Sequence, residues 1–288
     1  MPNHKLGVLS LFMAASLYGL YGIFSRLIGT SFGNFSQNYI RNLFVLAIIT
    51  SVIFLCKLKL APVLRKDMGW IILWFLSGSW VTVLTFIGFN HLQIGTTYLV
   101  IYSAMIFSGF LSGRVFFGER MNLKKTLALL LAFSGLLVIY NFTISPSETF
   151  YVFLVFVSGF MTGVWNTVSK KFSGNYPNSQ LIAMDAFSSV IAAFMGAAIF
   201  KEGLPDASSI KWFWVFVYGF VQMVNVGLVV YGFKNLEAQL GSIILPVEIV
   251  FAILFSYLIF GEVPGLAAFV GGILIVFSAV LPSLSLRR

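Results

Sequence analysis

Charged residues are scarce in this chain. They make up 9% of its 288 residues, whereas a soluble globular domain carries about 25%. Hydrophobic residues make up 59%, and the mean hydropathy is +0.96. This composition argues against a soluble protein and predicts a polytopic membrane protein that is solvated mainly by lipid.

Cysteine and histidine are nearly absent. The single Cys56 excludes an internal disulfide. Only His4 and His91 are present, both outside the expected membrane spans, so neither a His-Glu-x-x-His zinc protease nor a serine hydrolase is expected. The chain also lacks a glycine-rich phosphate loop, which argues against ATP as the energy source. We therefore expect no enzymatic activity, no metal site and no cofactor.

Ten apolar stretches account for most of the chain. Each is expected to form a helix, because about 20 apolar residues cross roughly 30 Å of hydrocarbon and a helix satisfies its own backbone. The stretches are 6–25, 37–56, 69–89, 92–116, 126–142, 150–168, 181–200, 212–233, 238–260 and 263–284.

The last five stretches repeat the first five at an offset of about 144 residues. Ser25-Arg26 recurs as Ser169-Lys170, and Phe117-Gly118-Glu119 returns as Phe260-Gly261-Glu262, one residue out of step. An odd number of crossings per repeat turns the second copy upside down in the membrane. The predicted fold is therefore all-α, with ten transmembrane helices as two inverted five-helix repeats, residues 1–145 and 146–288. Such a plan is typical of secondary transporters.

The basic residues that give the net charge of +9 are divided unequally between the two sides of the membrane. Only Arg26, Lys201 and Lys211 fall on the side opposite the N-terminus. By the positive-inside rule, both termini are expected in the cytoplasm, and no nucleic-acid partner is needed to explain the charge. The thirteen basic residues on the side of the N-terminus are Lys5, Lys57, Lys59, Arg65, Lys66, Arg120, Lys124, Lys125, Lys170, Lys171, Lys234, Arg287 and Arg288.

Several short motifs stand at distinctive places in the spans and at their ends. They are Arg41 in the second span, Phe-Gly-Glu-Arg at 117–120, Phe-Gly-Glu at 260–262, Pro246 in the ninth span and Gly271-Gly272 in the tenth. Together they resemble the drug/metabolite transporter superfamily, specifically its EamA-type members, over essentially the whole chain. The resemblance implies a ten-helix transporter of small organic metabolites, commonly an exporter in a bacterial inner membrane. The first half departs from the pattern, because Tyr102-Ser103 stands near the position of Leu245-Pro246.

Glu248 lies near the middle of the ninth span. A charge at the bilayer centre costs about 2.5–3.5 kcal/mol, so it normally faces protein or water. Pro246 removes a helix hydrogen bond and is expected to kink or open the helix beside it. A carboxylate there suits a proton or a substrate amine. The alternative is a buried structural partner of a basic or amide group.

Three further charges fall within spans. Arg41 and Asp185 occupy nearly equivalent positions in the second and seventh spans, so inversion places them near opposite faces and a direct pair is not expected. Arg41 is expected either to bind a substrate carboxylate or to snorkel outward or pair structurally. The same alternatives, binding or structural pairing, hold for Asp185. Arg114 is expected to be a positive-inside anchor.

Amides and aromatic rings lie in the middle of spans from both halves. They either line a wet cavity or simply pack, because amides in lipid must be bonded and many rings fill helix interfaces. The candidates are Tyr18, Tyr21, Trp80, Tyr98, Tyr102, Trp165, Asn166, Gln222 and Asn225.

Glu119 and Glu262 each follow Phe-Gly at the end of a span. Glycine lets the chain leave the helix, and a carboxylate there can bond free backbone N–H groups or a basic side chain. We expect a structural role at these hairpins. The alternative is a gating ion pair, for example between Glu119 and a cytoplasmic Arg or Lys.

The sequence as a whole favours a secondary transporter for a small organic metabolite, an amino acid or a similar neutral or zwitterionic solute. It would work by alternating access across the cytoplasmic membrane, as an exporter. A nucleotide-sugar, phosphate-ester or nucleoside carrier of the same fold is the nearest alternative, and a membrane sensor without transport is another. Expected partners are the metabolite, the lipid bilayer and, in a coupled cycle, protons. Both a monomer and a homodimer are compatible with the sequence.

Overall fold

The computed structural model describes residues 3–140, 145–206 and 208–283, and all regular structure within these ranges is helical. The predicted ends of two spans, at 142 and 284, lie outside the described residues, as do Arg287 and Arg288.

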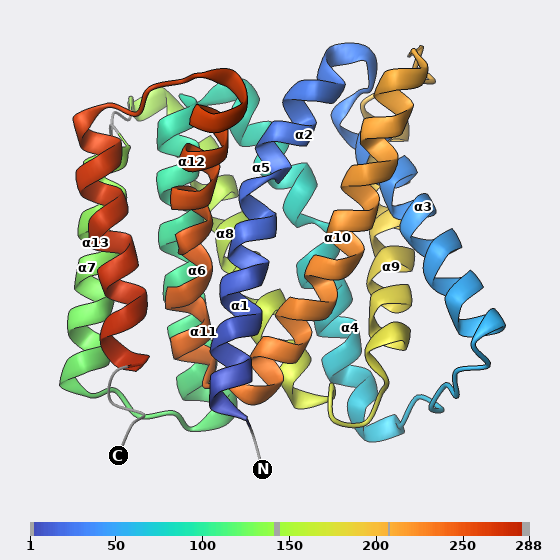
Figure 1. Ribbon diagram of the computed structural model, residues 1–288, viewed down its shortest axis with the longest axis horizontal. Helices are drawn as coiled ribbons and strands as arrows, with labels where there is room; N and C mark the ends of the chain where they lie inside the picture. The colour runs from blue at the N-terminus through green and yellow to red at the C-terminus, as the bar shows by residue number, and fades with distance from the viewer. Residues whose placement is uncertain (1–2, 141–144, 207, 284–288) are drawn as a thin grey trace.

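Each of the ten predicted stretches corresponds to one helix or to a broken helix (Figure 1). Eight of these helical segments within the described ranges are long and apolar enough to cross a membrane, and α7 and α13 are shorter. The first half holds α1 His4–Gly19, α2 Tyr21–Ile28, α3 Asn34–Leu55, α4 Arg65–Ser79, α5 Val81–His91, α6 Ile94–Phe117 and α7 Leu123–Ile139. The second holds α8 Thr149–Val168, α9 Asn178–Ile199, α10 Ser209–Asn235, α11 Ala238–Ile244, α12 Glu248–Phe260 and α13 Leu266–Ser283.

The two halves run in opposite senses through the bundle. In Figure 1, α1 begins at the end of the bundle where α13 finishes, whereas α8, its counterpart, begins at the other end. We call the end that holds the start of α1 and residues 56–64, 118–122, 172–177 and 236–237 the termini face. The opposite end, with residues 29–33, 92–93, 145–148, 200–206 and 261–265, is the distal face. The predicted inverted ten-helix fold is confirmed.

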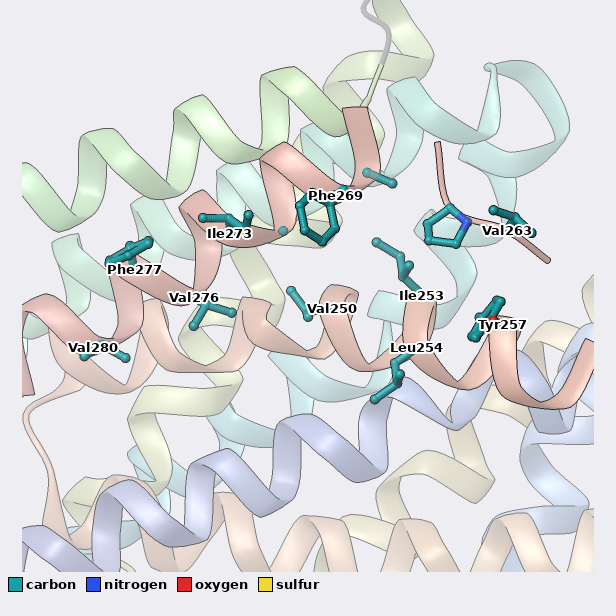
Figure 2. Close-up of a pocket in the computed structure, with 13 residues that line it drawn as sticks. Val250, Ile253, Leu254, Tyr257, Val263, Phe269, Ile273, Val276, Phe277 and Val280 are labelled. Atoms are coloured by element: carbon teal, nitrogen blue, oxygen red, sulfur yellow. The ribbon is translucent and has the colours of Figure 1, made fainter. Parts of the chain in front are cut away.

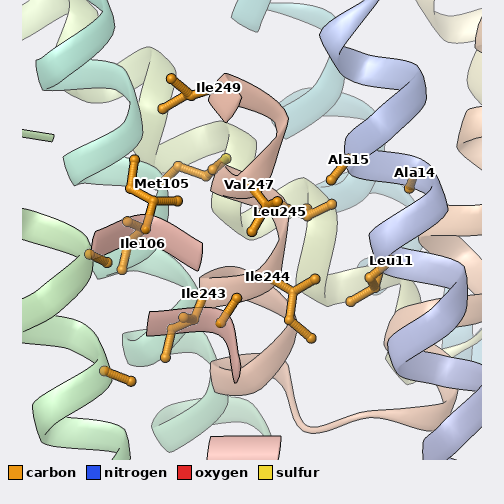
Figure 3. Packing of buried hydrophobic residues seen from close by; sticks show 14 of the residues in the cluster. Leu11, Ala14, Ala15, Met105, Ile106, Ile243, Ile244, Leu245, Val247 and Ile249 are labelled. Atoms are coloured by element: carbon orange, nitrogen blue, oxygen red, sulfur yellow. The ribbon is translucent and has the colours of Figure 1, made fainter. Parts of the chain in front are cut away.

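The repeats interlock instead of forming separate lobes. Helix α6 packs along α8, α7 along α13, α3 along α9 and α1 along α10. Apolar clusters therefore draw residues from both halves. Figure 3 shows part of one of them, where Leu11 and Ala15 of α1 approach Ile244 and Leu245, while Met105 of α6 contributes from the other side.

Three spans are interrupted inside the bundle. The first breaks at Leu20 and the third at Trp80. The ninth breaks at a single 3₁₀ turn, Leu245–Val247, which contains Pro246. The missing proline N–H removes a helix hydrogen bond, as expected from the sequence. Gly118 and Gly261 end α6 and α12 with φ of 66° and 71°, the left-handed conformation that glycine adopts without strain.

Helices α7 and α13 approach each other through glycine. A Cβ atom built on Gly135 would lie 2.8 Å from the carbonyl oxygen of Gly271 and 2.8 Å from the Ile275 side chain. We therefore expect Gly135→Ala to overpack this contact and to lower the unfolding free energy by about 1–3 kcal/mol. The matched control is Gly22→Ala in α2, where a Cβ meets nothing within 4 Å.

The control should leave stability unchanged or raise it by up to about 1 kcal/mol, since alanine favours helix over glycine. Thermal unfolding of the purified protein in detergent compares the two variants. Equal midpoints would rule out the close approach of α7 and α13.

Candidate functional site

A polar cavity of about 410 Å³ lies inside the bundle. Helices of both repeats line it, namely α1 to α5 from the first and α8 to α10 from the second. It extends from Asn34, which begins α3 at the distal face, to Trp165 and Asp185 in the half nearer the termini face. Six of the residues predicted from sequence line it: Tyr18, Tyr21, Arg41, Trp165, Asp185 and Gln222.

Arg41 points into this cavity and does not snorkel to the surface. Its guanidinium lies over the Tyr218 ring, 4.0 Å from the centroid, and donates a 2.8 Å hydrogen bond to Asn38 Oδ1. Its Nε is buried and has no hydrogen-bond partner among the described residues. The cation is thus oriented from two sides, while other N–H groups of its guanidinium stay available to a solute.

A network of amide side chains holds Asn38, the hydrogen-bond partner of Arg41, in place. Asn42, which is fully buried, donates to Asn38 Oδ1 at 2.8 Å and accepts from Gln222 Nε2 at 2.8 Å. Asn38 in turn donates to Thr82 Oγ1 at 3.1 Å. Sequence reasoning missed Asn38, Asn42 and Thr82. The available signal was the spacing of Asn38 from Arg41 and Asn42, which puts three polar groups within one turn of an apolar span.

Asp185 marks the inner end of the cavity. It accepts a 3.0 Å hydrogen bond from Trp165 Nε1. The Trp165 ring stacks on Trp74, with centroids 6.0 Å apart and planes at 10°. Trp74 is buried in a cluster with Phe172 and Tyr176, which fills the space toward the termini face.

Arg41 and Asp185 share the cavity without touching. Both lie seven residues after the start of a 22-residue helix, and these helices, α3 and α9, run antiparallel side by side. At about 1.5 Å of rise per residue, their Cα atoms differ by about 10 Å in depth. The ion pairs among the described residues are Arg26–Glu262, Lys125–Glu237 and Lys170–Glu119, so neither charge is neutralised by an opposite one.

A ladder of tyrosine rings forms another wall. The Tyr21 ring meets those of Tyr18 and Tyr218 edge-on, at centroid distances of 5.0 and 4.8 Å. Asn225 Nδ2 donates to the Tyr21 hydroxyl at 3.2 Å, while Asn225 Oδ1 is buried without a partner. Asn225 therefore lies behind the wall and positions a ring that faces the cavity.

Glu248 is the first residue of α12, directly after the break at Pro246. It lies outside the lining of the cavity. It accepts a hydrogen bond from the Tyr102 hydroxyl, which joins the fourth and ninth spans. Tyr98 stacks on Tyr102 with centroids 6.0 Å apart, so the two rings share one face of α6. Tyr102 in the fourth span therefore stands near the repeat position at which the ninth span is interrupted, Leu245–Val247.

Two predicted candidates lie away from the cavity. Trp80 stands at the junction of α4 and α5, is 37% exposed and is not among the residues that line the cavity. Asn166 is buried in α8, where its Oδ1 has no partner among the described residues.

Glu119 and Glu262 differ in their surroundings. Glu119 is buried and accepts hydrogen bonds from the backbone N–H groups of Ala238 (2.6 Å) and Gln239 (2.9 Å), and its other partner is Lys170 Nζ at 3.2 Å. Glu262 is exposed and bonds Ser256 and Arg26. The bond from Ser256, together with Arg26, holds the pKa of Glu262 below its ordinary value.

A larger hollow of about 630 Å³ lies between α12 and α13 (Figure 2). Its wall is apolar apart from Tyr257, and residues such as Val263 and Phe269 are largely exposed on the outside of the bundle. It offers neither charge nor amide to a polar solute, and lipid chains suit it better. The smaller inner cavity is therefore the candidate site.

Comparisons with known proteins agree with this architecture. A family model described as the EamA-like transporter family matches residues 5–141 and 149–284, one copy on each repeat. The "Uncharacterized transporter sll1164" of Synechocystis sp. (strain ATCC 27184 / PCC 6803 / Kazusa) is 29% identical over 152 residues, which are 50% of this chain and 41% of that protein. The match spans less than half of that relative's length.

A solved structure described as "Crystal structure of protein" superposes with a TM-score of 0.83 over 99% of each chain at 17% identity. At that identity the likeness shows the shared fold alone.

The amide network can be tested through Asn42. Asn42→Leu preserves size but removes the donor to Asn38 and the acceptor for Gln222. We expect the unfolding free energy to fall by about 1–3 kcal/mol, because buried polar groups are left unpaired. Ser51→Ala on the same helix is the control, since its hydroxyl is exposed and bonds only Ala47 O. Thermal unfolding in detergent measures both, and a midpoint for Asn42→Leu equal to the control would contradict the network.

Proposed function

Because this chain belongs to the EamA-like transporter family, we propose that it is a secondary transporter for small zwitterionic metabolites of the amino-acid kind. Arg41 binds the solute's carboxylate and Asp185 its ammonium group. One observation carries the proposal: a lone cation and a lone acid face one cavity and are not paired with each other.

Charge balance supports this solute class. An unpaired charge within a membrane span is costly, and the cavity holds one of each sign. A zwitterion satisfies both at once, whereas an anion or a cation leaves the other charge uncompensated. A carboxylate also matches the planar guanidinium, whose Nε has no protein partner. The volume of about 410 Å³ lies within the range of small-ligand pockets.

The residues that line the cavity suit a phosphate ester less well than a zwitterion. Phosphates carry up to two negative charges and are usually held by several cations or backbone N–H groups. Arg41 is the sole Lys or Arg among the described residues that line the cavity. The lining therefore favours a zwitterion over a nucleotide sugar.

The direction of transport is part of the same proposal. We place the protein in the inner (cytoplasmic) membrane of the cell. Its termini face then lies in the cytoplasm, as the distribution of Lys and Arg indicates. The cavity then reaches the external side, which is where an exporter releases its solute. Residues 1–145 and 146–288 act as the two repeats that rock about the cavity in alternating access.

The experiment reconstitutes the protein in liposomes with a panel of amino acids, their N-acetyl derivatives and the matching decarboxylated amines. Arg41→Gln should weaken amino-acid affinity by about 10- to 100-fold, the value of a charged hydrogen bond. It should leave the amines, which lack a carboxylate, unaffected. Asp185→Asn should weaken amino acids similarly and spare the N-acetyl derivatives. Ser189→Ala, a neutral change in the same wall, is the control.

Wild-type affinity for amino acids in both charge variants would refute the assignment of the solute's two ends. Saturable binding without any flux or counterflow would instead identify a sensor.

We also propose that Glu248 carries a proton in a coupled cycle. The support is its place beside a helix break, with a tyrosine hydroxyl as its partner and no cation among the ion pairs of the described residues. A carboxylate whose partner is a neutral hydroxyl can change its charge without breaking an ion pair. Glu248→Gln fixes the neutral form.

In liposomes, Glu248→Gln should abolish the acceleration of flux by a pH gradient while solute exchange at equal pH continues. Tyr102→Phe removes the hydroxyl partner alone and should keep coupling with a shifted pH profile. Undiminished dependence on the pH gradient in Glu248→Gln would show that Glu248 is scaffold.

A further inference from the structure

Three ion pairs among the described residues join the repeats, and two of them are related by the internal repeat. Glu119 of the first repeat bonds Lys170 of the second, and Glu262 of the second bonds Arg26 of the first. Lys170 is the repeat counterpart of Arg26, as Glu262 is of Glu119. The inversion puts one pair at each face of the bundle, Glu119–Lys170 at the termini face and Glu262–Arg26 at the distal face.

The termini-face pair is closed. The side chains of Glu119 and Lys170 are only 6% and 22% exposed. Because Glu119 also accepts both first N–H groups of α11, it ties the corner after α6 to the start of the broken ninth span. These bonds connect elements of both repeats at the termini face, which the cavity does not reach.

The distal-face pair is formed but exposed. Glu262 and Arg26 are 51% and 56% exposed, and the other partner of Glu262 is Ser256 of α12, the helix that precedes it. The counterparts of Ala238 and Gln239 are Ile94 and Gly95, which begin α6 as the former pair begins α11. Ile94 is 64% exposed, so the start of α6 is not covered in this state.

We infer that Glu119 and Glu262 are alternating latches, of which one is closed in each access state. The inference rests on the alternating access proposed above. In the opposite state, Glu262 leaves Ser256 and accepts hydrogen bonds from the N–H groups of Ile94 and Gly95, with Arg26 as counter-ion. Glu119 then releases α11, and the termini face opens. The reason is that inverted repeats can exchange conformations, so a contact made by one repeat has a counterpart available to the other.

The latches are unequal, which sets the resting state. Lys125 is buried beside the closed latch, where it pairs with Glu237 (2.6 Å) and donates to Gln239 Oε1 (2.7 Å). Counting from Glu262 as from Glu119, the counterpart of Lys125 is Ala268. The counterparts of Glu237 and Gln239 are Gln93 and Gly95. The distal latch therefore has no equivalent of this second ion pair, and the protein rests with its termini face closed.

The test measures distances between spin labels at both faces of the full chain in lipid nanodiscs, without solute. In a Cys56→Ser background, one pair of labels is placed at Arg120→Cys and Lys234→Cys on the termini face. The other pair is placed at His91→Cys and Val263→Cys on the distal face. Glu119→Gln should shift the termini-face distances longer and the distal-face distances shorter in the same sample. Lys170→Gln should do so to a smaller extent, because it leaves the backbone bonds of Glu119.

Glu262→Gln should leave both resting distances nearly unchanged, because the partners of Glu262 among the described residues are Ser256 and Arg26, and an exposed ion pair contributes little. It should nevertheless slow transport by disfavouring the opposite state. Glu148→Gln is the matched control, a glutamate that caps its own loop at Ser145 and, within the described ranges, bonds no second element. It should change neither distance nor flux.

A termini face that opens in Glu119→Gln without closure of the distal face would refute the alternating latch, and so would two unchanged distances. These distances are measured without solute, so the latch is judged separately from the zwitterion assignment. Failure of wild-type flux would overturn the proposed function even if the distances moved as expected.

Discussion

A charge inside a membrane-spanning bundle must be surrounded by hydrogen-bonding groups of the protein or by a polar solute, because lipid supplies neither. The structure around Arg41 and Asp185 is arranged by this requirement. Arg41 is held by Asn38 and by the Tyr218 ring, and Asp185 by Trp165. These supports orient each charge but do not neutralise it. The cavity therefore presents two charges without a counter-charge, which a bound solute can supply.

The helix interruptions follow the same logic. A break in a span frees backbone groups, which is tolerated where they are buried in protein or line a cavity. The breaks at Leu20 and Trp80 lie next to residues that line the cavity, Tyr21 and Val81, and the break at Pro246 precedes Glu248. The interrupted spans thus lie where the two repeats meet. The two charges lie on helices α3 and α9, one from each repeat, neither of which is interrupted.

Much of the fold could be predicted from hydropathy and the internal repeat, because both depend on local composition. The ten spans, the break at Pro246 and the glycine ends of α6 and α12 are properties of single segments. The candidate site depends on which helix faces meet, and a single span does not encode that. Asn38 and Asn42 were overlooked for this reason, although their spacing from Arg41 was visible. Trp80 was expected from sequence to line the cavity, but its neighbours Gly78 and Val81 do so instead.

The internal repeat also explains why the cavity has a positive charge at one depth and a negative charge at another. Arg41 and Asp185 stand at equivalent positions of the two repeats, so inversion alone sets them at different depths along one axis. Had both repeats carried the same residue, the cavity would hold two like charges about 10 Å apart in depth. Because the two repeats carry opposite signs there, a zwitterion bound as proposed would align its dipole with the direction of transport. In the proposed cycle the two charges keep their partners while access alternates around them, and the solute crosses without turning over.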